Sequence, residues 1–433
     1  MFEGKFADRM DFLQPSPIRK ITAIVSDVRA EGKKVYALNI GQPDVAAIPA
    51  FGEAVARKAT EDPQVSYTAF IGEKYLRETY ARYLNNYFER KNVSHFHIDT
   101  HNVAVTVGAS HGLTCVFLAL FNPGDEVLVF EPFFSAYRGF VVPSGAKLKA
   151  IPTKAEESFA LPPEEVIEKY ITPKTRGILV NSPCNPCGTF RTAEEMDMLA
   201  RICVKHNLYF ISDEVYREMV MGDEEVTCVF EVDLKNDEDN EALKNLMICV
   251  DSASKSFSLC GARIGFIVSK KEITDKVSHV VSNTVTCISD TLQYGVAAAY
   301  DEVLRDPSYF KKVRAVYRER RDATMAAIKE YLPNAVAPVP EGAFYVVVKF
   351  PEFEDISEYA MYMLTKFNLG GETVAITPAA GFYMTEGAGK NEMRIALVLG
   401  PEEMRRSIQI MAEALESYKE YKKSANADPI KKL

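Results

Sequence analysis

Short apolar runs alternate with helical patterns through the middle of the chain, and this alternation limits the fold more than any other feature. Residues 110–121 form one apolar helical pattern, and residues 192–207 form another, which a capping box opens at Thr192. Strands separated by helices build βαβ units, so an α/β fold is expected, with a mostly parallel sheet covered by helices. The expected strands are residues 103–107, 126–130, 177–181, 208–212, 246–250 and 264–268.

The pattern changes beyond about residue 300, where helices outnumber strands. At 433 residues the chain is long for one hydrophobic core, so a second, smaller α+β domain is expected there. The first fifty residues precede the sheet and are expected to join that domain. The predicted division is 1–50 for an N-terminal arm and part of the small domain, 51–305 for the large domain and 306–433 for the C-terminal small domain. The elements expected after residue 305 are helices at 308–332, 356–367 and 401–421 and strands at 343–349 and 392–398.

Two polar stretches are expected to be irregular. Residues 233–240 are rich in Asp, Glu and Asn, which is typical of a surface loop. The residues after 422 are charged and terminal, so a frayed tail is expected there.

Charge and cysteine usage limit the partners and the compartment. The net charge of −9, from 51 basic and 60 acidic residues, argues against nucleic acid or an anionic membrane as the main partner. The first residues include no apolar leader, and no stretch approaches the length that spans a bilayer. The 8 cysteines are scattered, so no disulfide framework is expected and a reducing, cytoplasmic compartment is predicted.

A lysine in an unusual setting follows the expected strand at 246–250. Lys255 lies among small hydroxyl residues, and residues 261–265 read Gly-Ala-Arg-Ile-Gly. A lone lysine in a loop is most often only solvated. The string Ser-x-x-Lys, followed by Gly-x-Arg-x-Gly, resembles the cofactor-lysine signature of class I and II aminotransferases. A lysine amine can form an imine with an aldehyde, and an arginine fork suits a phosphate dianion.

This resemblance implies both a fold and a cofactor. The fold is that of pyridoxal-phosphate transferases, with a seven-stranded, mostly parallel sheet between helices and a smaller α+β domain built from the two chain ends. The cofactor is pyridoxal 5′-phosphate, held as a Schiff base on Lys255, with Ser252 and Arg263 on its phosphate. Further matches extend the resemblance in family order from about residue 36 to residue 398, which covers nearly the whole chain.

The second match lies at the end of the strand expected at 177–181. Residues 181–188 resemble the family pattern Asn-x-Pro-x-Asn-Pro-x-Gly, with Cys187 where Thr is usual. The resemblance implies that Asn185 bonds the phenolic oxygen of the cofactor. The spacing Cys184-x-x-Cys187 also allows a metal or redox interpretation, but no second pair has zinc-like spacing, so no metal is expected.

The third match, Asp213 and Tyr216, follows the strand expected at 208–212. In the family pattern Asp213 faces the pyridine nitrogen and keeps it protonated, while Tyr216 reaches the phenolic oxygen. Taken alone, an aspartate at the end of a strand is more often a helix cap.

Two more segments match cofactor contacts. Residues 108–112 follow a strand and open a helix, whose N-terminal N–H groups and dipole favour an anion. The resemblance implies that Ala109 and Ser110 lie on the phosphate, although the segment alone reads as a tight turn. Residues 132–137 match the segment whose aromatic side chain stacks on the cofactor ring, which Phe134 is expected to provide unless it only fills the core.

The remaining matches concern the substrate and the subunit interface. Residues 391–397 resemble the Asn-x-x-Arg motif, which makes Arg394 the clamp for the substrate α-carboxylate, together with Asn185 and the backbone of Gly41. Tyr67 resembles the tyrosine that binds the phosphate of the neighbouring subunit's cofactor. An obligate homodimer with shared active sites is therefore expected. Residues 378–383 depart from the usual Pro-Gly pattern.

The expected reaction moves the amino group of an L-amino acid to a 2-oxo acid, with Lys255 carrying the proton between the substrate Cα and the cofactor. A C–S lyase or related lyase on the same fold would use the same residues. A regulator would need an added DNA-binding segment, and fewer than forty residues precede the first family match, so it is not expected. A catalytically inactive binding module would lack Lys255 or Asp213, and both are present. Aspartate with 2-oxoglutarate is the first expectation, although Ser110 stands where some relatives place a lysine for the distal carboxylate. Alanine and aromatic amino acids stay open.

Overall fold

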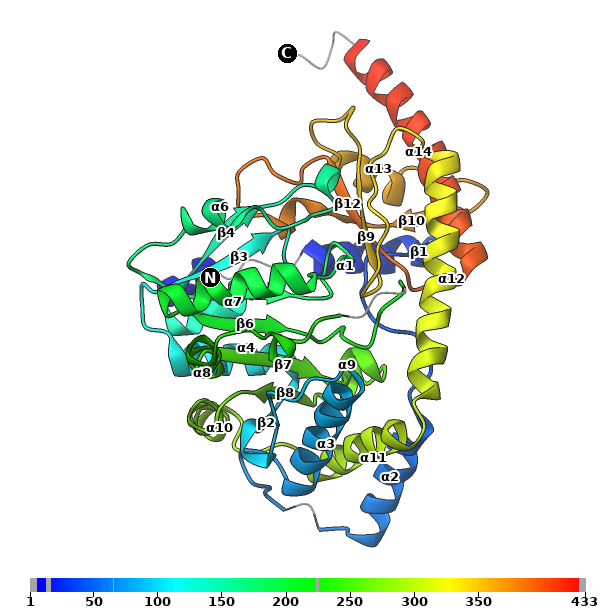
Figure 1. Ribbon diagram of the computed structural model, residues 1–433. Helices are drawn as coiled ribbons and strands as arrows, with labels where there is room; N and C mark the ends of the chain where they lie inside the picture. Colours follow the sequence, from blue (N-terminus) through cyan, green and yellow to red (C-terminus); the bar gives the residue numbers. More distant parts are fainter. Residues whose placement is uncertain (1–5, 13–16, 65, 223–225, 428–433) are drawn as a thin grey trace.

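A seven-stranded sheet forms the centre of the computed structural model, which describes residues 6–12, 17–64, 66–222 and 226–427 (Figure 1). β8 runs antiparallel to both of its neighbours, and the other adjacent pairs are parallel. The expected fold, with a mostly parallel seven-stranded sheet, is therefore confirmed. The strand order is β2 (Val103–Thr106), β8 (Gly265–Val268), β7 (Met247–Ser252), β6 (Tyr209–Asp213), β5 (Thr175–Asn181), β3 (Glu126–Glu131) and β4 (Lys147–Pro152).

The edge strand β4 is the one strand of this sheet that the sequence analysis missed. Its sequence begins with Lys147 and includes Lys149, and only two of its residues are buried. Lysines are common on edge strands, where they discourage pairing with another chain. They also interrupt the apolar run by which the other strands were recognised.

Helices pack along the sheet. α4 (Gly108–Leu120) contacts β7 and β8, and α7 (Ala193–His206) contacts β5 and β6. The capping box expected at Thr192 is present, because its hydroxyl accepts from the Glu195 N–H and the Glu195 carboxylate accepts from the Thr192 N–H. The other helices of this part are α2 (Pro49–Glu61), α3 (Lys74–Arg90), α5 (Tyr137–Val141), α6 (Glu164–Glu168), α8 (Asp237–Lys244), α9 (Ala253–Ser256), α10 (Lys271–Thr284) and α11 (Asp290–Arg305).

A smaller α+β part packs above the carboxyl ends of the parallel strands (Figure 1). β1 (Lys34–Ala37) pairs in parallel with β10 (Glu372–Ala375), so segments from both halves of the chain meet in it. The expected boundaries at residues 50 and 305 stay a prediction. The other elements are the antiparallel strands β11 (Thr377–Pro378), β12 (Glu392–Ala396) and β9 (Tyr345–Lys349) and the helices α1 (Pro17–Ala30), α12 (Ser308–Tyr331), α13 (Ser357–Thr365) and α14 (Pro401–Ala427).

The predictions for the two polar stretches were wrong in part. α8 occupies the second half of the stretch expected as a loop, because the Asn236 side chain accepts from the N–H groups of Glu238 and Asp239 at 3.0 and 3.4 Å. Its acidic first turn also suits the helix dipole. α14 continues past residue 422 to Ala427, and the rest of the expected tail lies outside the described residues.

The last residues of the parallel strands lie at one edge of the sheet. Asn181 is paired with Asp213 across β5 and β6, and Asp213 is paired with Val250 across β6 and β7. Ligands of open α/β sheets bind in the crevice outside the carboxyl ends of the strands. Within the described ranges, no helix is both long and apolar enough to cross a membrane.

Candidate active site

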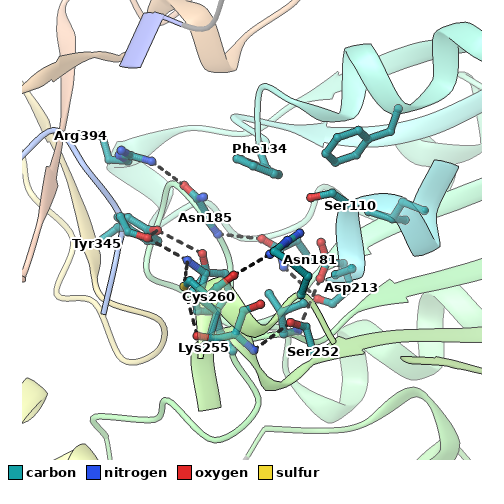
Figure 2. Close-up of a pocket in the computed structure, with 18 residues that line it drawn as sticks. Ser110, Phe134, Asn181, Asn185, Asp213, Ser252, Lys255, Cys260, Tyr345 and Arg394 are labelled. Atoms are coloured by element: carbon teal, nitrogen blue, oxygen red, sulfur yellow. Dashed lines mark hydrogen bonds between the residues drawn. The ribbon is translucent and has the colours of Figure 1, made fainter. Parts of the chain in front are cut away.

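A cavity of about 280 Å³ opens at this edge, between the sheet and strands β9 and β12 (Figure 2). Every residue that the sequence analysis assigned to the site, apart from Tyr67, lines it. The lining residues are Gly41, Ala109, Ser110, Leu113, Phe134, Phe140, Asn181, Asn185, Asp213, Val215, Tyr216, Ser252, Ser254, Lys255, Cys260, Arg263, Tyr345 and Arg394.

Asp213 places a buried carboxylate at the end of β6. Its Oδ2 accepts a hydrogen bond from the Tyr137 hydroxyl, and the Val215 N–H lies 3.4 Å from its Oδ1. Burial raises the pKa of Asp213 to about 7, and these two hydrogen bonds oppose that shift. A cationic group bound beside this buried carboxylate would stabilise its ionised form.

Lys255 lies on the short helix α9, directly after β7. Its Nζ donates to the Gly41 carbonyl at 2.8 Å and lies 3.9 Å from the Cys260 sulfur. The rings of Tyr216 and Phe344 lie 5.8 and 5.5 Å from the ammonium. The amine is therefore held inside the cavity, and among the described residues no ion pair joins it to a carboxylate.

The start of α4 and the Arg263 guanidinium form a cradle for an anion. Arg263 donates to the Cys260 and Val107 carbonyls at 2.9 and 3.3 Å, which aims its fork at the helix N-terminus. A Cβ on Gly108 would lie 2.4 Å from the Arg263 Nη2, and a Cβ on Gly265 would lie 2.4 Å from the Gly108 carbonyl carbon. The close approach of these groups therefore requires both glycines, and the α4 N–H groups with the guanidinium suit a phosphate.

Arg394 provides the second cationic feature, on β12. It is 1% exposed; its Nη1 donates to Asn185 Oδ1 at 3.0 Å and its Nη2 donates to the Asn39 carbonyl at 2.7 Å. Its Nε has no hydrogen-bond partner among the described residues. Burial lowers the pKa of the guanidinium from its usual value. A buried guanidinium with a free N–H calls for an anion from outside the chain.

Several residues to which the sequence analysis gave no role also lie in this site. Tyr345 bonds the Tyr216 hydroxyl at 3.1 Å and stacks beneath Arg394 at 4.6 Å. The Asn181 side chain accepts from the Asn185 N–H at 2.8 Å and fixes that loop. Asn181 lies in the same sequence motif as Asn185, and Tyr137 lies in the same motif as Phe134. A polar side chain within such a motif could have been recognised as a candidate site residue. Tyr345 offered no such signal, because its place depends on how β9 packs.

Tyr67 does not line the cavity. It is 86% exposed, and Phe70 beside it is 53% exposed. Exposed aromatic side chains of this size are uncommon away from interaction surfaces. The predicted role of Tyr67 in a neighbouring subunit stays a prediction.

Comparison with known proteins identifies the family. The family model described as aminotransferase class I and II matches residues 33–410. A probable aspartate/prephenate aminotransferase of Aquifex aeolicus is 30% identical over 95% of this chain and 98% of its own length. An aromatic-amino-acid aminotransferase of Thermococcus litoralis is 28% identical over 95% of this chain and 99% of its own length.

A solved structure agrees with these matches. The aspartate aminotransferase from Thermus thermophilus with maleate has a TM-score of 0.82 and 26% identity, covering 95% of this chain and 100% of that one. These relatives favour amino transfer over a lyase reaction. The chain belongs to the class I and II aminotransferase family and is a pyridoxal-phosphate-dependent transaminase.

Proposed function

We propose that this cavity binds pyridoxal phosphate through Lys255 and moves the amino group of an L-amino acid to a 2-oxo acid, with L-aspartate and 2-oxoglutarate as the first pair to test. The observation that supports this most is the convergence of a lysine amine, a buried carboxylate and a partly unpartnered buried guanidinium on one cavity.

The residues present fit the cofactor. The cradle of α4 and Arg263 suits its phosphate, with the Ser252 hydroxyl beside it. Asp213 suits the ring nitrogen, because burial has raised its pKa and a cationic partner would compensate that cost. Phe134 offers a ring to stack on, and Asn185 and Tyr216 offer donors for the phenolic oxygen. When bound, pyridoxal phosphate supplies an aldehyde for the amino group and a ring that accepts electrons from the substrate Cα.

Arg394 binds and orients the amino acid. Its Nε is free for one carboxylate oxygen, and its Nη groups are already oriented by Asn185 and Asn39. A substrate carboxylate held by this fork would keep the amino acid in the cavity that Lys255 also lines. Lys255, once freed by exchange with the substrate amine, would take the proton from the substrate Cα and deliver it to the aldehyde carbon of the cofactor.

The substrate side chain is the finer part of the proposal. Relatives named aspartate aminotransferase support aspartate. The cations that line the cavity are Lys255, Arg263 and Arg394, and each already has a role. Among the described residues the cavity therefore holds no further cation for a distal carboxylate, and its lining includes the ring of Phe140, to which no cofactor role is assigned. This observation favours a second candidate, an aromatic amino acid, unless the neighbouring subunit supplies the missing charge.

A homodimer with shared active sites is also part of the proposal. The exposed Tyr67 and Phe70 support it, since a second copy would cover them. A cytoplasmic location is supported by the cysteines, all of which lie in described segments and are free thiols.

Single-substrate titration tests the function. The loaded protein is mixed with one L-amino acid and no oxo acid, and the 2-oxo acid released is measured together with the cofactor absorbance. Release of one equivalent of 2-oxo acid, with conversion of the bound cofactor to pyridoxamine phosphate, is expected for the true substrate. Continued formation of pyruvate and ammonia without that conversion would overturn the proposal. Comparing aspartate, alanine and phenylalanine ranks the side chains.

A further inference from the structure

A buried ion network lies directly behind the cofactor cavity, and none of the roles proposed for the site residues uses it. At its centre is Arg217, whose side chain is 1% exposed. Its Nε and Nη2 donate to Glu214 Oε2 at 2.9 and 2.8 Å, and its Nη1 donates to Asp251 Oδ2 at 3.0 Å. Nη2 also lies 3.3 Å from the Cys249 sulfur. One guanidinium thus joins two carboxylates that come from neighbouring strands.

Each carboxylate is next in sequence to a residue of the site. Glu214 follows Asp213 where β6 ends, and Asp251 precedes Ser252 at the end of β7. The last backbone bond between these segments runs from the Glu214 N–H to the Val250 carbonyl at 2.8 Å. Beyond it, the described backbone of the two turns is no longer paired as strands, and Arg217 is the link that continues between them.

Each oxygen of the two carboxylates accepts at least one hydrogen bond. Glu214 Oε1 accepts from the Val229 N–H at 2.8 Å, and Asp251 Oδ1 accepts from the Ser252 N–H at 2.6 Å. The Tyr80 hydroxyl donates to Asp251 Oδ2 at 2.6 Å. A buried network that is fully satisfied holds its members in one arrangement, whereas a partly satisfied one does not.

The same atoms explain a cluster that resembles a metal site. Glu214, Cys228 and Cys249 bring potential ligand atoms within 4.8 Å of one another. Arg217 Nη2 already contacts the carboxylate and one of the sulfurs. The positive charge that this cluster attracts is therefore the protein's own guanidinium.

We propose that Arg217 is a positioning residue of the cofactor site. It fixes the separation between the turn that carries Asp213 and Tyr216 and the turn that carries Ser252 and Lys255. The inference rests on the proposed roles of these four residues, since a cofactor bound at its phosphate, its aldehyde and its ring nitrogen spans both turns. Mispositioning one turn by a fraction of an ångström leaves each group intact but prevents them from binding the same molecule together.

Binding of two different ligands distinguishes a positioning role of Arg217 from a general loss of structure in the variant. Inorganic phosphate needs only the cradle of α4, Arg263 and Ser252, and the pairing of Ser252 with Gly265 across β7 and β8 holds Ser252 without Arg217. Pyridoxal phosphate also needs Asp213 and Lys255 at the right separation. The test is calorimetric titration of cofactor-free Arg217→Lys with each ligand, beside the wild type. Lysine keeps the charge but lacks the fork that reaches both carboxylates. The expected result is at least a tenfold weaker affinity for pyridoxal phosphate and an unchanged affinity for phosphate.

Arg314→Met is the matched control. Arg314 pairs with Glu218, the last residue of the turn that follows Asp213, and has no hydrogen bond to Asp213, Tyr216 or the Ser252 turn. This variant should retain wild-type affinity for both ligands, even if its melting temperature falls. If Arg217→Lys does not fold, Asp251→Asn keeps the arginine but removes the negative charge and one of the two acceptor oxygens of its partner, and the same pattern is expected from it.

The outcomes are separable from those of the proposed function. Equal loss of both affinities in the folded variant, or no loss of either, would overturn the positioning role. Failure of the wild type to bind pyridoxal phosphate in a Lys255-dependent way would instead overturn the proposed function itself.

Discussion

The Tyr137 hydroxyl donates a hydrogen bond to the Asp213 carboxylate, although the two residues lie 76 positions apart in the chain. Tyr137 begins α5 and Asp213 ends β6, and both side chains are buried. The bond stabilises the ionised form of Asp213, against the burial that raises its pKa to about 7. The phenol thus helps to keep the carboxylate negative where the cofactor's ring nitrogen is proposed to lie.

Removing this hydroxyl should weaken catalysis without removing the cofactor site. A hydrogen bond to a charged group contributes about 1.5–3 kcal/mol, so Tyr137→Phe should lower kcat/KM roughly tenfold to a hundredfold. The acid limb of its pH profile should also move to higher pH, because the pKa of Asp213 rises. Steady-state kinetics between about pH 5 and pH 9 check both points. Tyr362→Phe, which loses a bond to Ser417 on α14, is the control and should leave the profile unchanged.

The raised pKa of Asp213 also predicts how the cofactor-free protein responds to pH. Its folded pKa of about 7 lies above the ordinary value of 3.8. The stability that the protonated side chain contributes is therefore present below about pH 4 and is lost as the pH rises through about 7. Relative to Asp213→Asn, the wild type should lose on the order of 2 kcal/mol of unfolding free energy between about pH 5 and pH 8. Urea unfolding at several pH values measures the difference, and parallel curves for the two proteins would contradict the assignment.

The glycine at the start of β8 should be essential for phosphate binding. Gly265→Ala would bring a Cβ within 2.4 Å of the Gly108 carbonyl carbon and push the start of α4 away from Arg263. We expect the affinity for pyridoxal phosphate to fall more than tenfold. Gly261→Ala is a matched control, because a Cβ there would meet nothing within 4 Å. Equilibrium dialysis measures the affinity of the two cofactor-free variants for pyridoxal phosphate. Equal affinities would show that the close approach of β8 to the start of α4 is not needed.

Replacing the buried arginine of β12 should affect the substrate more than the cofactor. Arg394→Lys keeps the charge but loses the two-pronged contact, so KM for the amino acid should rise roughly a hundredfold. The cofactor content of the purified variant should match that of the wild type. Titration with primary amines that lack a carboxylate is the further check, since Arg394→Lys should bind these amines almost as tightly as the wild type does. An unchanged KM for amino acids would remove Arg394 from the substrate site.

Subunit exchange tests the proposed role of Tyr67. If this exposed side chain serves the neighbouring subunit's cofactor, a hybrid of Tyr67→Ala and Lys255→Ala subunits contains one site with both residues intact. Mixing the two inactive variants under conditions that exchange subunits should therefore restore activity. If Tyr67 served its own subunit, every site in the mixture would stay defective and no activity would return.

Local sequence patterns predicted the strands and the site motifs of this protein, but they did not predict the contacts between distant segments. Apolar periodicity located the inner strands, and the motifs at their ends placed Asp213, Lys255 and Asn185 on one edge. The edge strand β4 and the helix α8 were missed, because lysines and acidic residues obscured their patterns.

Contacts between distant segments had no local signature. The bond from Tyr137 to Asp213, the pairing of Arg217 with Asp251 and the place of Tyr345 beneath Arg394 depend on how whole elements pack. A tyrosine or an arginine in an apolar segment indicates only that some partner exists. Its identity follows from the tertiary structure.

Borohydride trapping identifies the lysine that holds the cofactor. The loaded protein is reduced with borohydride, which fixes the cofactor to whichever lysine holds it, and the peptides are mapped by mass spectrometry. A phosphopyridoxyl group on Lys255 is expected, and prior addition of the true amino-acid substrate, without oxo acid, should abolish the label. A label on another lysine, or a label on Lys255 that no amino acid displaces, would show that Lys255 is not the Schiff-base residue of a transaminase.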